Sequence, residues 1–266
     1  MHTFLYVSNY EGHSSETLLK SATAITKRCL PSIGRNVWDR YCMLPTLKGG
    51  YACLEPECEG RRPMVSEARI NPYSVVVFGE VFDPCRPNPA EAVLYAWRSS
   101  GAAGVRALEG SFSAVISGLS DGTVTLISDA LGQRDLRYTV RGNTLVVSPH
   151  DVPIVATGLC PIEIDWTSAC SVACFKMSVD GKSLLKGIEA CRPHEYYQWS
   201  ATTGIRRFAD PILKMEERIR PDDDKGVKAQ LHRIIKNARI NASKRLSGES
   251  EIQVTLSAGF DSRAIF

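Results

Sequence analysis

The sequence IQVTLSAGFDSRAIF occupies residues 252–266 and joins a strand-like run to a small, polar turn. Apolar and polar residues alternate from Ile252 to Leu256, which predicts a strand. Gly259 lets the backbone turn tightly after that strand. A helix is expected from about Asp261, and its free N–H groups would face an anion. This order of elements predicts a pyrophosphate-binding loop.

The polar side chains of this loop suit a nucleotide phosphate. Ser257 and Ser262 can donate hydrogen bonds to phosphate oxygens, and the Asp261 carboxylate can hold the Mg²⁺ that accompanies ATP. The GxxxxGK[ST] pattern of a Walker A loop is absent. The alternative is an ordinary strand-turn-helix corner, with Gly259 at the turn and Asp or Ser as the helix N-cap. The predicted ATP-binding residues are Leu256, Ser257, Ala258, Gly259, Phe260, Asp261 and Ser262, with Asp261 as the Mg²⁺ ligand.

Composition excludes several classes of partner. The chain has 266 residues, 44% of them hydrophobic, with 32 basic and 29 acidic residues spread along it. This near balance gives little support to binding of a polyanion, so no nucleic-acid partner is expected. The sequence has no apolar run long enough to cross a bilayer, and its N-terminus lacks the basic and apolar regions of a signal peptide. A cytoplasmic protein without a membrane partner is expected.

The nine cysteines do not predict a metal site. Cys53 and Cys58 form one close pair and Cys170 and Cys174 another, but neither pair has C-x₂-C spacing and no histidine lies at zinc-ligand spacing. An odd number of cysteines without a signal peptide also argues against a disulfide framework. Buried, reduced thiols are expected instead.

The first 150 residues predict a mixed α and β region. Asp121-Gly122 and Gly142-Asn143 are turn signals between β-rich runs, so residues 112–148 are expected to form consecutive antiparallel hairpins. Asn88 and Pro89 predict a helix start. Strands are expected at residues 3–8, 74–82, 111–118, 123–128 and 145–148.

The rest of the chain changes character twice. Four prolines between residues 150 and 211 indicate connections and edge strands. A helix is then expected from about Asp222 to Arg245, with apolar residues at helical spacing and His232 as an ordinary exposed side chain. Helix, turn, strand and loop in this order predict the opening of a doubly wound α/β nucleotide domain. Because a parallel sheet needs further strands, we expect the chain to be an N-terminal fragment of a longer protein.

These segments carry a family resemblance. LSAGFDSRAI, residues 256–265, is similar to the SGGxDS-type loop of the asparagine synthetase family, a branch of the ATP-pyrophosphatases, with Ala258 in place of the second glycine. Upstream segments match the family in the same order, and the Asp129–Tyr138 segment is the most specific of them. They are VVVFGEVFD (75–83), LEGSFSAVI (108–116), DALGQRDLRY (129–138) and SLLKGIEACRPHEYY (183–197).

The resemblance implies a two-part enzyme. Residues 1–205 would form a glutaminase-like α+β domain of the N-terminal-nucleophile type, with four αββα layers. A linker, 206–221, would lead to residues 222–266, the start of an α/β, doubly wound ATP-pyrophosphatase (PP-loop) domain. ATP and Mg²⁺ are the implied cofactors.

The first domain is expected to have lost its glutaminase activity. That chemistry needs a cysteine as the first residue after removal of the initiator Met, and position 2 is His2. In addition, Phe78 replaces the Asn of the family's Asn-Gly-Glu pattern, which removes an amide donor. Groups for the second synthetase step would lie beyond Phe266, so no catalytic residue is identified in this chain.

Three functions stay open at this point. The first is an asparagine synthase-like ligase that adenylates a small-molecule or peptide carboxylate and transfers it to ammonia or an amine. The second is intramolecular amide formation, as in β-lactam synthetases and lasso-peptide cyclases. The third is a non-catalytic scaffold or dimer surface, and a homodimer is among the expected assemblies.

Overall fold

The computed structural model describes residues 3–9, 14–29, 37–56, 64–83, 85–176, 178, 182–209 and 224–246. The chain divides into two compact units, Met1–Ile212 and Leu213–Phe266. No helix among the described residues has the length and hydropathy needed to cross a membrane.

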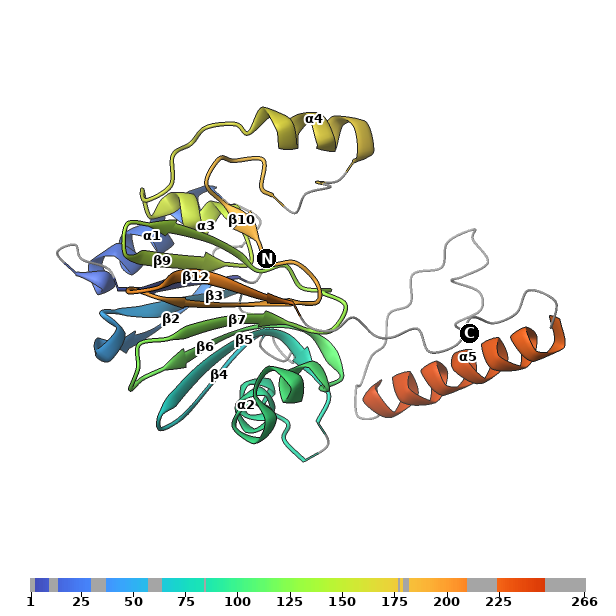
Figure 1. Ribbon diagram of the computed structural model, residues 1–266. Helices are drawn as coiled ribbons and strands as arrows, with labels where there is room; N and C mark the ends of the chain where they lie inside the picture. The colour runs from blue at the N-terminus through green and yellow to red at the C-terminus, as the bar shows by residue number, and fades with distance from the viewer. Residues whose placement is uncertain are drawn as a thin grey trace. The chain divides into compact units, whose positions relative to one another are not determined.

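The first unit contains two six-stranded antiparallel sheets. Sheet A has the order β10-β8-β9-β1-β3-β2 and sheet B has the order β12-β11-β7-β6-β5-β4 (Figure 1). The strands of sheet A are β1 (Thr3–Ser8), β2 (Val37–Leu44), β3 (Gly49–Pro56), β8 (Arg137–Arg141), β9 (Thr144–Ser148) and β10 (Glu189–Ala190). Those of sheet B are β4 (Val65–Ile70), β5 (Tyr73–Val81), β6 (Gly110–Gly118), β7 (Val124–Ser128), β11 (Glu195–Ser200) and β12 (Gly204–Ala209).

Helices cover the outer faces of both sheets. On sheet A lie α1 (Ser15–Cys29) and α3 (Asp151–Ala156), and on sheet B lies α2 (Pro89–Arg106). The first unit also contains α4 (Trp166–Phe175) and a short 3₁₀ helix, η2 (Pro45–Leu47). The α+β arrangement with four αββα layers, expected of the first domain, is therefore what the described residues form.

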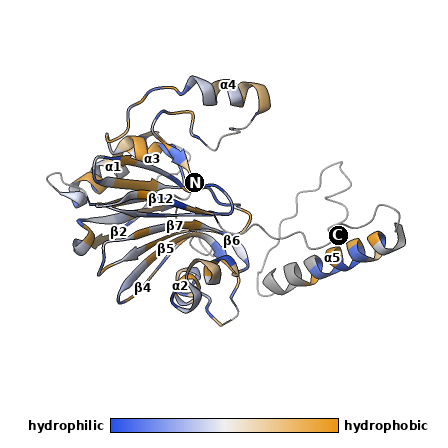
Figure 2. Cartoon of the chain, in the orientation of Figure 1, coloured by the Kyte–Doolittle hydropathy of each residue, from blue (hydrophilic) through white to orange (hydrophobic). Residues whose placement is uncertain are grey.

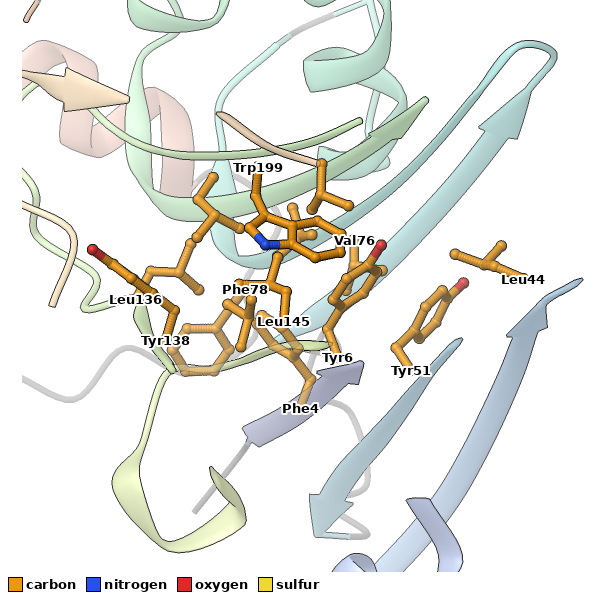
Figure 3. Close-up of a cluster of buried hydrophobic side chains, with 14 of the residues drawn as sticks. Phe4, Tyr6, Leu44, Tyr51, Val76, Phe78, Leu136, Tyr138, Leu145 and Trp199 are labelled. Carbon is orange, nitrogen blue, oxygen red and sulfur yellow. The ribbon is translucent and has the colours of Figure 1, made fainter. Parts of the chain in front are cut away.

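The central strands alternate between two apolar surroundings, which explains their nearly continuous apolar sequences. In β1, Phe4 and Tyr6 face the space between the sheets, while Leu5 and Val7 face α1 and α3. Figure 3 shows part of the cluster between the sheets, which includes Trp199 of β11. Three layers of buried side chains therefore hold the four structural layers together.

The predicted strands 3–8, 74–82, 111–118, 123–128 and 145–148 all occur, with ends shifted by at most one residue. The Asp121-Gly122 turn joins β6 to β7, and Gly142-Asn143 joins β8 to β9. Both predicted hairpins therefore occur, one after the other along the chain, although they belong to different sheets. The chain crosses between sheets after β7, at the loop that begins with Asp129.

Residues 150–210 contain more than the predicted connections and edge strands. β10 and β12 are edge strands, but α3 and α4 are helices. β12 extends to Ala209 because it pairs along its whole length with β11, so the predicted linker 206–221 begins with strand residues.

In the second unit the structure describes one helix, α5 (Asp224–Leu246), where the sequence predicted one. Figure 2 shows hydrophobic and hydrophilic residues on this helix, and His232 is exposed as expected. The predicted α/β ATP-binding domain otherwise lies outside the described residues and stays a prediction. The exposed apolar residues of α5 are Leu231, Ile234, Ile235 and Ile240.

Candidate functional site

The predicted ATP-binding loop, Leu256 to Ser262, lies outside the described residues, and so does the proposed Mg²⁺ ligand Asp261. His2 also lies outside them. The structure does describe the glutaminase-like part of the predicted site, at the beginning of β1 and around Phe78.

The beginning of β1 is buried and polar. Thr3 pairs with Leu54 of β3 in the sheet register. Its hydroxyl lies 3.4 Å from the hydroxyl of Ser148 at the end of β9. Both residues are buried, so the start of β1 is enclosed between two neighbouring strands.

Phe78 fills the position at which the family resemblance would supply an amide. Its ring lies on the inner face of β5 and is only 6% exposed. The ring centre lies 6.4 Å from that of Phe4 and 6.2 Å from that of His150, which it meets edge-on. The Arg134 guanidinium lies over the ring, 5.7 Å from its centre. An apolar, packed ring therefore occupies the place of a hydrogen-bond donor.

The neighbouring backbone donor is already engaged. Gly79 N–H donates to the Met64 carbonyl at 2.8 Å. Gly79 has a φ of +116°, and a Cβ there would lie 2.1 Å from the Ser111 carbonyl oxygen, so only glycine fits. Oxyanion stabilisation requires donors that point at the developing charge. Neither the Phe78 side chain nor the Gly79 N–H meets this requirement.

Three thiols of the first unit, those of Cys53, Cys160 and Cys191, are also unsuited to nucleophilic attack. Burial raises the pKa of Cys53 to about 12. Burial also raises the pKa of Cys160 and of Cys191. A catalytic cysteine needs the opposite shift, because the thiolate is the nucleophile.

The expectation that the cysteines are all buried was wrong for several of them. Cys170 and Cys174 are exposed because α4 turns most of its surface to solvent, and Cys29 and Cys85 are exposed at a helix end and in a loop. Cys58 lies outside the described residues. Among the described residues no group of three or more metal-binding side chains is found.

The DALGQRDLRY segment, which carried the most specific resemblance, has a structural role. The Asp129 carboxylate accepts hydrogen bonds from the N–H groups of Phe112, Leu131 and Gln133, at 3.2, 2.9 and 3.0 Å. These bonds fold the loop that leads from sheet B to sheet A. Gly132 has a φ of +63° and contacts Pro193 so closely that a Cβ would lie 2.8 Å from the proline ring. The loop brings Arg134 to the Phe78 ring.

The role of Arg106 could not be predicted from the sequence. This residue lies at the end of α2 and donates to the backbone carbonyls of Ser128, Asp129 and Glu195, at 2.8, 2.8 and 2.6 Å. Its guanidinium therefore ties α2 to the Asp129 loop and to the beginning of β11. No sequence motif marks an arginine whose partners are backbone carbonyls.

A cavity of about 150 Å³ lies at the other end of β1. Its lining includes Ser8, Lys48, Asp121 and Trp199. Pockets that hold small molecules usually measure about 300–1,000 Å³. This cavity is too small to replace the Phe78 region as the candidate site.

Comparison with known proteins gives matches of structure alone. No protein-family model matches the sequence, and no curated protein matches it. This chain is similar in structure to glutamine phosphoribosylpyrophosphate amidotransferase from B. subtilis complexed with ADP and GMP. The TM-score is 0.46 at 11% identity, over 80% of this chain and 50% of that one. A structure described as the allosteric regulatory enzyme of purine biosynthesis gives 0.46 at 10% identity, with the same coverage.

The chain therefore spans half the length of each of these two solved chains.

Proposed function

We propose that the first unit is a glutaminase-like domain without glutaminase activity, attached to an asparagine synthase-like ligase. The ligase would adenylate a carboxylate with ATP and pass the acyl group to ammonia or an amine. The packing of Phe78 against Phe4, His150 and Arg134 supports the proposed absence of glutaminase activity. The proposed ligase activity rests on the sequence of residues 256–262.

The proposed ATP site uses the polar groups of the loop. Ser257 and Ser262 would donate to the pyrophosphate, and Asp261 would hold Mg²⁺, so that the leaving group is neutralised as the acyl-adenylate forms. The substrate carboxylate would attack the α-phosphorus, and pyrophosphate would depart. The amine would then displace AMP from the acyl group.

Pyrophosphate release tests the ligase. The protein is incubated with Mg²⁺-ATP and pooled carboxylate substrates, and pyrophosphate is measured. We expect substrate-dependent release that is lost in Asp261→Asn and kept in Asp121→Asn, a control in an exposed turn of the first unit. Release that does not depend on substrate, or that survives Asp261→Asn, would contradict the ligase.

Glutamine hydrolysis tests the first unit separately. We expect no glutamate from glutamine with the wild-type protein. Phe78→Asn restores an amide donor but supplies no nucleophile, so it should also release none. Glutamate production by either protein would show that another residue acts as the nucleophile.

The filled position at Phe78 also favours a second candidate, intramolecular amide formation. An enzyme whose substrate carries its own amine has no use for ammonia released from glutamine. The mass of the product separates the two candidates. Loss of one water from the substrate indicates cyclisation, whereas a gain of ammonia with loss of water indicates amidation.

A further inference from the structure

Helix α4 lacks the charged outer face of an ordinary surface helix. Its ten residues, WTSACSVACF, include no charged residue, and only Ser168 is buried. Figure 1 shows α4 standing outside the four layers, beyond α3. A solvated helix normally turns charged side chains to water. The exposed surface of α4 therefore has the composition of a contact surface.

Four exposed residues of α4 form one stripe, which we call the α4 stripe: Trp166, Cys170, Ala173 and Cys174. Their spacing of i, i+4, i+7 and i+8 places them on one side of the helix. Trp166 is 70% exposed, and Ile162, which precedes the helix, is 79% exposed. Exposed tryptophan side chains are common anchors of protein interfaces once a partner covers them.

Hydrogen bonds fix the place where α4 begins. Asp165 N–H donates to the Leu184 carbonyl at 2.9 Å, and Lys186 N–H donates to the Glu163 carbonyl at 2.9 Å. The Asp165 side chain caps the helix by accepting from Ser168 N–H at 3.0 Å. These hydrogen bonds attach the segment that begins α4 to residues 184 and 186, and so fix the position of the α4 stripe.

We propose that the α4 stripe is a homodimer surface, on which α4 of a second copy packs in the antiparallel direction with Cys170 at the two-fold axis. A symmetric interface requires a surface that complements itself. The α4 stripe meets this condition because it contains no charged residue, so pairing two copies brings no like charges together. The small side chains of its alanine and cysteines let two helices approach closely. Trp166 of each copy would lie opposite the partner's Cys174.

The charges at the two ends of α4 support the antiparallel direction. Lys176 follows the helix and is exposed, whereas Asp165 precedes it. Glu163, two residues earlier, is paired with Lys186 of its own chain at 3.2 Å, so Asp165 is the acidic group of this end. Antiparallel pairing brings the lysine of one copy to the acidic end of the other, and a parallel pair would put like charges together. The helix dipoles also oppose one another in this direction. Every residue of the proposal belongs to the first unit, so it stands apart from the proposed ligase function.

Chemical cross-linking and sedimentation test the dimer. The 266-residue chain is reduced, the reductant is removed, and the chain is treated with a short bis-maleimide under anaerobic conditions and digested. Linked peptides are identified by mass spectrometry. We expect a Cys170–Cys170 link between chains, with no equivalent link at Cys85, which is also exposed. Sedimentation velocity over a concentration series should show a monomer-dimer equilibrium.

Two matched variants place a lysine on opposite sides of α4. Cys170→Lys puts two like charges at the two-fold axis and should raise the dimer dissociation constant at least tenfold. Phe175→Lys is the control, since Phe175 is 66% exposed and lies on the other side of the helix from Trp166. It should leave the dissociation constant within about twofold.

Three results would overturn the proposal. The first is a chain that stays monomeric at every concentration with Cys170 reactive. The second is a monomer in which Cys170 resists maleimide, because another segment or protein then covers the stripe. The third is a dimer that forms equally well in Cys170→Lys. Circular dichroism of both variants checks that the first unit remains folded.

Discussion

Substitution of Asp129 by alanine should destabilise the first unit strongly. The carboxylate is 2% exposed and accepts from three backbone N–H groups, of which that of Phe112 belongs to a buried strand. A buried donor left without a partner costs about 1–3 kcal/mol, and each lost bond to a charged acceptor about 1.5–3 kcal/mol where water does not replace it. Water can reach the Leu131 and Gln133 N–H groups, so we expect a total of about 3–5 kcal/mol.

Urea denaturation followed by tryptophan fluorescence measures this loss. All four tryptophans precede residue 213, so the emission reports on the first unit. Asp121→Ala is the matched control, because Asp121 is exposed and, among the described residues, accepts from the N–H and hydroxyl of Thr123 alone. It should cost about 0.5–1 kcal/mol. Asp129→Asn, which keeps one acceptor oxygen, should fall between the two.

A loss below about 1 kcal/mol for Asp129→Ala, or one no larger than that of Asp121→Ala, would refute this reasoning. It would mean that the loop is held by its other contacts, such as those of Arg106. An unchanged m-value is also required, since a change would indicate that the unfolding is no longer two-state.

Three further predictions concern the core. Phe78→Ala should lower the free energy of unfolding by about 3–5 kcal/mol in the same urea assay, because it leaves a cavity among Phe4 and its neighbours. Burial raises the pKa of Tyr6 from 10.0 to about 12. Between pH 10 and 12 the phenol ionises in the unfolded state but stays neutral in the folded state. The free energy of unfolding should therefore be unaffected by ionisation of Tyr6 below pH 10 and fall by about 1.4 kcal/mol per pH unit between pH 10 and 12. Tyr6→Phe should reduce this slope when urea titrations are repeated at several pH values. Maleimide should label Cys85 at once and Cys53 only on unfolding, as mass spectrometry of labelled peptides would reveal; equal labelling rates would contradict the burial of Cys53.

Local signals in the sequence predicted several strands and two hairpins because turn chemistry and β-branched runs determine them. Asp121-Gly122 and Gly142-Asn143 are examples, as is the Asn88 cap of α2, whose side chain accepts from Ala90 N–H at 3.0 Å. These features depend on residues that are close in sequence. They need no knowledge of the sheet to which each strand belongs.

Longer-range features were missed for physical reasons. The buried face of α1 consists of Leu19, Ala22, Thr23 and Thr26, so a single large apolar residue is too little to mark a helical period. The crossover after β7 depends on the Asp129 carboxylate and its backbone partners, which are brought together only by folding. α4 was missed because it is short and has no charged residue to mark a polar face.

The candidate site was predicted in part. The loss of a donor at Phe78 followed from the residue itself, and the structure adds that the ring is packed on several sides. The contributions of His150 and Arg134 could not be predicted, because they come from other segments. The ATP-binding loop stays a prediction, since it lies outside the described residues.

The edges of the two sheets bear on how copies of this protein meet. A sheet edge offers unpaired backbone groups to other chains, and proteins protect edges with short strands and charged side chains. β10 has only two residues, and β12 turns Arg206 and Arg207 to solvent. β10 and β12 each form one edge of their sheet, and β2 and β4 form the opposite edges. Pairing of copies strand to strand is therefore discouraged at two of the four edges.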